Sequence, residues 1–206
     1  MTISHQLARP FIEAWHYSNC VPTGKNIFFA WFDDNLELYA VADYGIGVNP
    51  YQAPFLATAT GLPVTTGALV ELKRLCRSEP KQDGFPLTSF LAECHRQLVK
   101  LGYEYVVSFS DPEWGHDGGV YKAANFVHLG QTNPEYHLVD VEGVVRHRRY
   151  AFRYARRHDV PLAQAREELG VQRIKTRPKD RWFLPIVRIS KTARRHLLTA
   201  QTGEKA

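Results

Sequence analysis

The sequence predicts an α/β protein with one substantial core, and three observations support this fold class. Segments with the alternation of strands take turns along the chain with segments of helical periodicity. Hydrophobic residues make up 44% of the 206 residues, a composition that excludes wholesale disorder. Residues 104–130 run from a buried strand through a polar, glycine-rich loop into a short helix and another strand. Such a turn places polar groups at the carboxyl edge of a sheet, where α/β proteins bind ligands.

A helix and a β-hairpin open the chain. Apolar residues recur on one side of the segment 4–15, which predicts an amphipathic helix, and Ser4 is placed to cap it. Strands over 26–32 and 36–42 flank an Asp-Asp-Asn turn and form a hairpin. Residues 43–67 are rich in Gly, Pro and Thr, so we expect a long irregular loop there.

The middle of the chain alternates strands and helices. A third strand is expected over 68–76, where charged residues interrupt apolar ones. A helix over 89–101 follows, with apolar residues at helical spacing and a glycine directly after its end. The β-branched and aromatic run at 105–109 predicts a buried strand, and a short helix over 120–125 leads into a strand over 126–129.

The C-terminal part has short predicted strands and many charged residues. We expect a hairpin over 137–145, a basic helix over 146–158, a second helix over 162–169, an extended segment over 171–176, a strand over 182–187 and a basic helix over 191–198.

Charge is distributed unevenly along the chain. Residues 1–145 hold 9 Lys/Arg and 16 Asp/Glu, whereas residues 146–206 hold 17 Lys/Arg and 5 Asp/Glu. Cations at this density attract polyphosphates, and a basic cluster is the usual sign of nucleic-acid binding. On the helix over 146–158, Arg149, Arg153 and Arg156 line one face, and Tyr150 and Tyr154 beside them would either stack on an extruded base or anchor the helix. The candidate DNA-binding residues are Arg148, Arg149, Arg153, Arg156 and Arg157.

Several classes of protein do not fit this sequence. Three cysteines without a Cys-x-x-Cys spacing indicate free thiols in a reducing compartment. The apolar runs are too short to span a bilayer, and the N-terminus does not resemble a signal peptide. His116, His128 and His137 are spaced too irregularly to predict a metal site. We therefore expect a cytoplasmic protein without a metal cofactor and without a membrane partner.

The order of elements resembles that of the GNAT N-acetyltransferase fold. In that family a tyrosine on the short fourth helix precedes, by five residues, an aromatic residue that opens the next strand. Tyr121 and Phe126 have this spacing, and Asn125 stands where GNAT proteins usually carry glycine. The resemblance implies a single domain over 1–206 with a mixed, splayed β-sheet flanked by helices. A basic helical insertion at about 146–170 would then be an addition to that domain.

A narrower resemblance links the chain to the Mom family of phage DNA-modification proteins. It covers about residues 14–187 and rests on the following segments: HYS at 16–18 with Pro22 and Gly24, LKRLCRS at 72–78, SDPEWGHDGGVYKAANFVHLG at 110–130 and KDRWFLP at 179–185. The resemblance implies transfer of an acetamido-type (carbamoylmethyl) group to the N6 amine of adenine in DNA. The product protects phage DNA from host restriction enzymes.

The group donor is less evident. GNAT proteins bind the pyrophosphate of acetyl-CoA in a glycine-rich turn, but the corresponding segment 74–85 holds a single glycine. Arg74, Arg77 and the helix start near Ser89 are the candidate donor-binding residues. Acetyl-CoA and an aminoacyl group carried on tRNA therefore both stay open as donors.

Adenine N6 is a poor nucleophile, so the enzyme has to accept its proton and protonate the leaving group. We assign the contact with N6-H to Asp111, the general base to His116 and the acid to Tyr121. Trp114 is a candidate for stacking on the flipped base, since the segment 111–114 is similar to the acidic, proline and aromatic tetrapeptide of adenine N6-methyltransferases. Tyr17, Ser18 and Asn125 complete the expected acceptor site.

Two other functions stay open. The chain would be a GNAT-type N-acyltransferase for a protein or a small amine if the basic region served another purpose. It would be a DNA-binding protein without activity if the Asp, His and Tyr residues of segment 111–121 only supported the loop.

Overall fold

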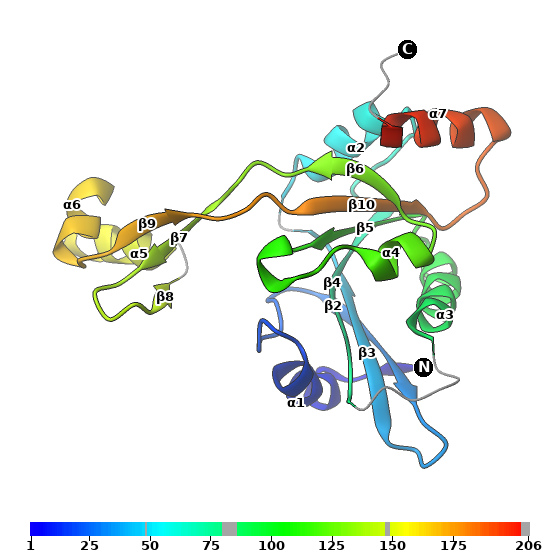
Figure 1. The fold of residues 1–206 in the computed structure, drawn as a ribbon, viewed down its shortest axis with the longest axis horizontal. Helices are drawn as coiled ribbons and strands as arrows, with labels where there is room; N and C mark the ends of the chain where they lie inside the picture. Colours follow the sequence, from blue (N-terminus) through cyan, green and yellow to red (C-terminus); the bar gives the residue numbers. More distant parts are fainter. Residues whose placement is uncertain (48, 80–85, 147–148, 203–206) are drawn as a thin grey trace. The chain divides into compact units, whose positions relative to one another are not determined.

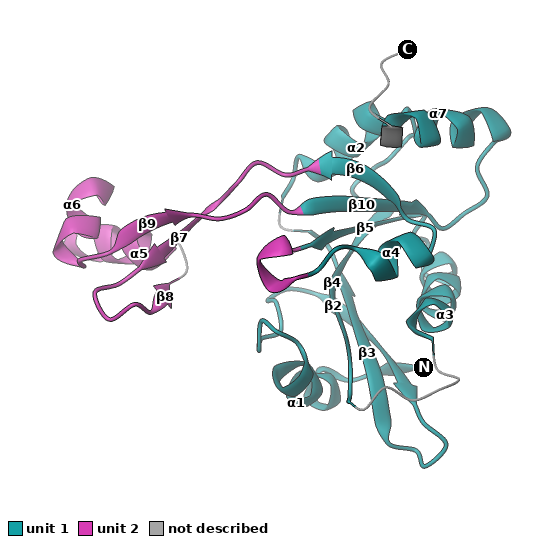
Figure 2. Ribbon diagram, in the orientation of Figure 1, with its two compact units in different colours: residues 1–110, 116–130, 180–206 teal, residues 111–115, 131–179 magenta. Residues whose placement is uncertain are grey.

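The computed structural model describes residues 1–47, 49–79, 86–146 and 149–202. The chain forms two compact units (Figure 2). The first comprises residues 1–110, 116–130 and 180–206, and the second comprises residues 111–115 and 131–179.

A mixed β-sheet forms the centre of the first unit (Figure 1). Its strands, in spatial order, are β1 (Thr2–Ile3), β2 (Asn26–Phe32), β3 (Leu38–Gly45), β4 (Leu69–Arg77), β5 (Tyr105–Ser110), β10 (Asp180–Pro185) and β6 (Val127–Gln131). Neighbouring strands from β1 to β4 are antiparallel, and so are β5 and β10. The late strand β10 thus lies between β5 and β6, although β6 precedes it in the chain.

The sheet splays between β4 and β5, as the GNAT resemblance predicts. These strands pair in parallel from Leu69 with Tyr105 to Leu72 with Ser108. Beyond Leu72, β4 continues to Arg77 and pairs with β3, while β5 continues to Ser110 and pairs with β10. The edges of β4 and β5 that face each other are therefore no longer paired with one another in this part of the sheet.

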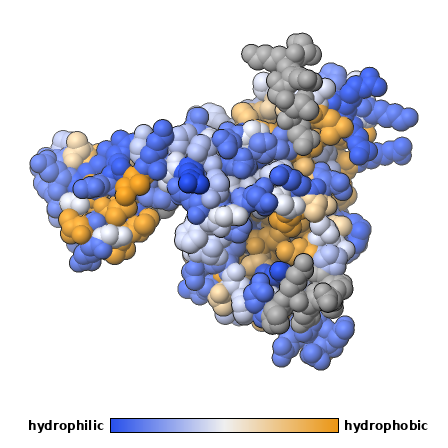
Figure 3. All heavy atoms as spheres, viewed as in Figure 1, coloured by the Kyte–Doolittle hydropathy of each residue, from blue (hydrophilic) through white to orange (hydrophobic). Residues whose placement is uncertain are grey.

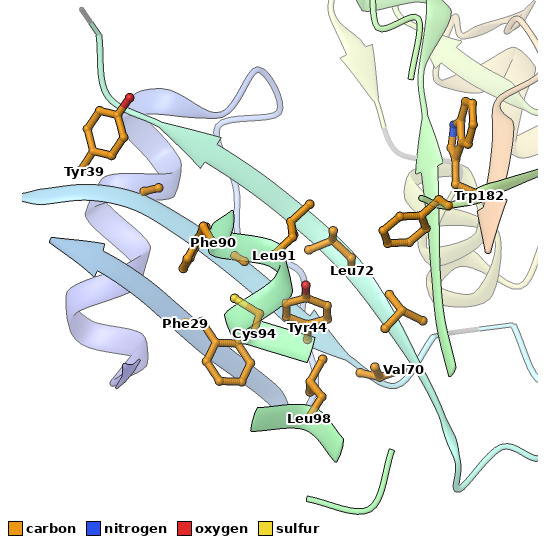
Figure 4. Close-up of a cluster of buried hydrophobic side chains, with 14 residues drawn as sticks. Phe29, Tyr39, Tyr44, Val70, Leu72, Phe90, Leu91, Cys94, Leu98 and Trp182 are labelled. Carbon is orange, nitrogen blue, oxygen red and sulfur yellow. The ribbon is translucent and has the colours of Figure 1, made fainter. Parts of the chain in front are cut away.

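Helices cover both faces of the sheet. The helix α3 (Leu87–Lys100) turns Phe90, Leu91, Cys94 and Leu98 toward side chains of β2, β3 and β4, and Figure 4 shows this cluster. On the other face, α1 (His5–Trp15) packs on β2 and β3, and α2 (Gln52–Thr60) and α7 (Lys191–Thr202) pack on β5, β6 and β10. The alternation of β5 fits this division, because Val106 lies in the α3 cluster whereas Tyr105 and Val107 lie in the α2 cluster.

Most expected elements are confirmed within a few residues. Ser4 caps α1 as predicted, since its Oγ accepts a hydrogen bond from the Leu7 amide. The irregular loop expected over 43–67 is wrong, because β3 runs to Gly45 and α2 occupies Gln52–Thr60. The sequence of α2 is apolar around most of its circumference, so it lacks the amphipathic pattern by which a helix is recognised.

The second unit is a small sheet with two helices. Its strands lie in the order β8 (Val145–Arg146), β7 (Tyr136–Val139) and β9 (Gln172–Lys175). The helices α5 (Arg149–His158) and α6 (Leu162–Glu168) follow the expected hairpin, and Leu138, Ala151 and Val171 form a common core. Figure 3 shows apolar side chains among hydrophilic ones on the surface of this unit. None of the helices in the described ranges has the length and apolar composition that a membrane span requires.

Candidate active site

Tyr121 stands on α4 (Gly119–Ala123), and its ring is held between two aromatic side chains. It stacks on Trp182 of β10 with ring centroids 5.7 Å apart and meets Phe126 edge-on at 5.4 Å. Its hydroxyl lies 2.9 Å from Ser108 Oγ of β5. Burial raises the pKa of Tyr121 to about 12, and the hydrogen bond with Ser108 acts in the opposite direction. Tyr121 therefore carries its proton at neutral pH, and it holds this proton more tightly than a tyrosine in water does.

The loop before α4 is shaped by contacts between two segments that are far apart in the sequence. Gly118 has φ +75°, a left-handed conformation that favours glycine, and it packs directly on the indole of Trp182. The Trp182 Nε1 in turn donates a hydrogen bond of 2.9 Å to Ser110 Oγ. Asp117 Oδ1 accepts the Gly119 amide at the start of α4. The GHDGG and KDRWFLP segments thus form one support for Tyr121.

His16 ends α1 and is buried and uncharged. Its Nδ1 accepts the Ser18 amide at 3.1 Å and lies 2.8 Å from Ser18 Oγ. Burial, followed by the charges of Arg74 and His116, lowers the pKa of His16 to about 3. Because a backbone N–H occupies Nδ1, the proton of the neutral ring is on Nε2. His16 is consequently a hydrogen-bond donor and cannot act as a base near neutral pH.

Two of the expected site segments meet at Tyr17. Its ring contacts His116, with centroids 5.0 Å apart, and it also contacts His16 at 4.3 Å. Tyr17, Arg74 and Glu71 are close enough to Tyr121 to influence its pKa. The structure therefore brings Tyr17 and His116 into contact, and Tyr121 lies near enough to Tyr17 for the two hydroxyl groups to influence one another.

A buried carboxylate on β3 was missed in the sequence. Asp43 is inaccessible to solvent, and burial raises its pKa to about 7 against the smaller opposing effects of Lys73 and Arg74. Asn26 Nδ2 donates to Asp43 Oδ2 at 3.3 Å, and Lys73 Nζ donates to the Asn26 amide oxygen at 3.1 Å. The other carboxylate oxygen of Asp43 has no hydrogen-bond partner among the described residues. The alternation of β3 was the available signal, because it places Asp43 on the same face as the buried Val41.

The candidate donor-binding residues make contacts in three different places. Arg74 donates hydrogen bonds to the carbonyl groups of Cys20 and Lys73. Arg77 contacts the Tyr39 hydroxyl and Glu79. Ser89 lines a cavity of about 650 Å³ between β2 and α3. Of the three, Arg74 is the one whose charge acts on Tyr121 and His16.

Asp111 and Trp114 belong to the second unit. Asp111 Oδ2 forms an ion pair with Lys179 Nζ at 3.0 Å, and Oδ1 accepts the Glu113 amide. Trp114 is exposed at the end of a single 3-10 turn (Pro112–Trp114). Asn125 has φ +63°, so it makes the left-handed turn between α4 and β6 for which GNAT proteins use glycine.

The arginines of α5 are accessible. Arg149, Arg153, Arg156 and Arg157 are all exposed, whereas Arg148 lies outside the described residues. Of the two neighbouring tyrosines, Tyr150 lies below the Arg146 guanidinium and Tyr154 contacts His158 and bonds with Glu168. Tyr154 is thus an anchor of the helix, and Tyr150 and Phe152 are the exposed aromatic side chains between Arg149 and Arg153.

The described side chains offer no group of three or more His, Cys, Asp and Glu residues that would hold a metal ion.

The sequence matches one protein family over almost its whole length. The model of the Mom protein family matches residues 1–202. The methylcarbamoylase Mom of Escherichia phage Mu is 27% identical over 143 residues, which are 68% of this chain and 57% of that protein. The chain thus spans less than two thirds of the length of this relative.

Solved acetyltransferases are similar in structure. A spermidine N-acetyltransferase variant from Vibrio cholerae is 9% identical, with a TM-score of 0.48, and the match covers 90% of this chain and 94% of that one. A Bacillus subtilis acetyltransferase in complex with CoA is 14% identical, with a TM-score of 0.42, over 89% of this chain and 85% of that one.

Proposed function

The chain belongs to the Mom protein family, and from this premise we propose that it is a transferase that modifies the exocyclic N6 amine of adenine in DNA. The name of the phage Mu relative, a methylcarbamoylase, supports transfer of a carbamoylmethyl-type group. We further propose that the modified DNA is phage DNA, that it thereby resists host restriction enzymes, and that the protein acts in the host cytoplasm.

One observation carries the proposal. Residues from three separate family segments meet beside the splay of the sheet: Tyr17 contacts His116, and Tyr17 and Arg74 both act on the pKa of Tyr121. Packing alone does not need an exposed histidine, a cation and a protonated phenol in one place, whereas proton transfer during group transfer does.

The transfer step needs one bond to form and one to break. With an acyl donor, the N6 atom attacks the carbonyl carbon, the bond from this carbon to the thiol of CoA or to the tRNA oxygen breaks, and the N6 proton passes to His116. Tyr121 protonates the leaving group. His16 is not the base, because its pKa of about 3 leaves it without affinity for a proton near neutral pH.

We assign the acceptor contacts as follows. Trp114 stacks on the extruded adenine, Asp111 accepts a hydrogen bond from N6-H, and Tyr17, Ser18 and Asn125 border the acceptor. Asp111 is held in place by its ion pair with Lys179, and its carboxylate oxygens can only accept hydrogen bonds. The arginines of α5 bind DNA phosphates.

The donor is either acetyl-CoA or an aminoacyl group carried on tRNA. Acetyl-CoA would leave an N6-acetyl group, whereas a glycyl group holds the same atoms as a carbamoylmethyl group and would give it by rearrangement after the transfer. Both donors contain amide or ester groups that pair with backbone N–H and C=O, and the edge of β4 beyond Leu72 is not paired with β5. Arg74, Arg77 and Ser89 remain our candidates for contacts with the phosphate-bearing part of the donor. No metal enters this scheme.

The test is mass spectrometry of nucleosides from the DNA of cells that express the full chain. We expect an adenosine derivative of increased mass, and we expect Tyr121→Phe to lower its yield at least tenfold. Asp34→Ala is the control, because it changes an exposed side chain in the turn between β2 and β3. Unmodified adenosine at confirmed expression would refute the proposal and favour transfer to a protein or small amine, or DNA binding alone.

A further inference from the structure

We propose that Ser108 is a positioning residue whose hydroxyl group changes its hydrogen-bond acceptor when Tyr121 gives up its proton. The inference rests on the proposed role of Tyr121 as the acid. It adds a second residue to that role and explains why a serine stands inside an otherwise apolar stretch of β5.

The geometry around Ser108 determines the direction of its hydrogen bonds. Ser108 Oγ lies 2.9 Å from the Leu72 carbonyl oxygen and 2.9 Å from the Tyr121 hydroxyl oxygen. A serine has one hydroxyl proton, and a carbonyl can only accept. While Tyr121 is protonated, both bonds form if Tyr121 donates to Ser108 and Ser108 donates to Leu72.

Loss of the Tyr121 proton reverses one of these bonds. The proton moves from Tyr121 to the leaving group, and Tyr121 becomes a phenolate that can only accept. The proton of Ser108 stays on Ser108, but rotation about its Cβ–Oγ bond directs it from Leu72 to the phenolate. No heavy atom has to move, and a hydrogen bond to a charged oxygen is stronger than one to a carbonyl.

Tyr121 is partly buried, and Ser108 is fully buried. The pairing of Ser108 with Leu72 is the last parallel one before the sheet splays. Trp182 and Phe126 hold the ring of Tyr121 from other sides. Even a partly buried phenolate without a donor would be costly, so the serine hydroxyl has a specific task here.

Other groups also face Tyr121 and have to be considered in a titration. They are Tyr17 from the segment after α1, Glu71 and Arg74 from β4, and Tyr44 from β3. Arg74 lowers the pKa of Tyr121, whereas Tyr17 and Glu71 raise it. All of them stay unchanged in a Ser108 variant, so a change in the titration of Tyr121 reports on the serine.

The test measures the titration of position 121 directly. A trifluorinated tyrosine is incorporated at position 121 of the full chain, because fluorination brings the pKa into a range where the protein is folded, and ¹⁹F NMR follows its ionisation. We expect Ser108→Ala to raise this pKa by about one to two units, as loss of one hydrogen bond to a charged group implies. Ser108→Thr keeps the hydroxyl and should titrate like the parent.

The matched control is Ser110→Ala. Ser110 is also buried, lies two residues further on the same face of β5, and bonds with Trp182 Nε1 instead of Tyr121. It should leave the titration within a few tenths of a unit. If Ser108→Ala does not fold, Ser108→Cys, whose thiol is a weak donor, should shift the pKa in the same direction. An unshifted pKa in the folded Ser108 variant would overturn the inference.

Activity gives a second, separable readout. We expect Ser108→Ala to lower kcat for DNA modification about 10- to 100-fold without a matching change in KM for DNA, and to have little further effect in a Tyr121→Phe background. Equal losses in both backgrounds would indicate a purely structural serine and overturn the inference. Because the NMR titration needs no substrate, failure of the proposed DNA modification would be seen in the parent protein, independently of the pKa result.

Discussion

Replacement of Gly118 by alanine tests the contact that joins the loop of the site to β10. A Cβ atom at this position would lie 2.1 Å from Trp182 Cζ2 and 2.5 Å from Cε2, distances that real structures do not tolerate. Trp182 cannot give way easily, because it is buried, stacks on Tyr121 and donates a hydrogen bond to Ser110. Alanine must therefore displace the loop or the indole.

The expected loss has two parts. The left-handed backbone at φ +75° costs an alanine roughly 1–2 kcal/mol. Overpacking against the indole adds about 1–3 kcal/mol. Gly61→Ala is the matched control, because Gly61 lies in the same unit, has φ +68° and has no atom within 4 Å of a built Cβ. Gly61→Ala should show the loss of stability from the left-handed backbone without the loss from overpacking.

The assay is urea unfolding followed by circular dichroism on both variants and the parent. We expect Gly118→Ala to lose about 1–3 kcal/mol more than Gly61→Ala, and about 2–4 °C of melting temperature per kcal/mol. Trp182→Phe leaves more room, so the cost of Gly118→Ala should be smaller in that background. Equal losses for the two glycine variants would refute the close packing of Gly118 on Trp182.

Three further outcomes follow from buried charge and exposed cations. Burial raises the pKa of Asp43, so the contribution of this residue to stability is present at acid pH and is lost as pH rises toward about 7. Between pH 5 and pH 8, the free energy of unfolding of Asp43→Asn should therefore rise by about 2–3 kcal/mol relative to that of the parent, as measured by urea unfolding. The lowered pKa of His16 acts in the opposite direction, so the parent should lose stability as pH falls from about 6.5 toward 3, and His16→Asn should lose less over that range. Alanine at Arg149, Arg153 and Arg156 together should weaken DNA binding in fluorescence anisotropy titrations and reduce the salt slope by roughly one unit per lost contact.

Each of these outcomes has a control and a contrary result. Glu13→Gln, an exposed carboxylate in a local ion pair, should show no comparable pH dependence. If the stability difference between Asp43→Asn and the parent did not change with pH, Asp43 would not be a buried, protonated carboxyl group. If His16→Asn lost as much stability in acid as the parent does, His16 would not be a buried, neutral histidine. Alanine at the exposed cations Arg9 and Arg96 should leave the salt slope unchanged. The same slope for the α5 variant and the parent would show that DNA contacts another surface.

Much of the fold was predictable because its elements have strong local patterns. The strand at 105–110 is a buried run, and α3 presents apolar residues at helical spacing, so both were predicted close to their observed bounds. The helix α2 was not, since its sequence is apolar around most of its circumference and lacks the periodicity of an amphipathic helix. The spatial order of the strands was not predictable from local patterns. No such pattern indicates that β10 lies between β5 and β6, and the splay was expected only from the resemblance to a known fold.

The candidate site was predicted in part for the same reason. Tyr121 and His116 stand in one loop, whereas the contact of Tyr17 with His116 joins residues that are about a hundred positions apart. Trp182 belonged to a quoted segment, but its role below Gly118 depends on a close approach that sequence does not encode locally. In the sequence, Ser108 is one polar residue within a strand. Its role becomes visible only in the structure, where its hydroxyl lies beside the Leu72 carbonyl and the Tyr121 hydroxyl.

The insertion of the second unit between β6 and β10 has a consequence for the order of folding. The chain enters and leaves this unit at Thr132 and Lys179, where the Thr132 amide donates to the Lys179 carbonyl and the Lys179 amide to Thr132 Oγ1. A connection of nearly 50 residues, compared with a tight turn, adds about 2 kcal/mol of loop-closure entropy to the pairing of its ends. This addition disappears once residues 131–179 have folded and hold Thr132 beside Lys179. The second unit should therefore fold first, and β10 should join β5 only afterwards, so that the Trp182 support of Tyr121 is among the last parts of the first unit to form.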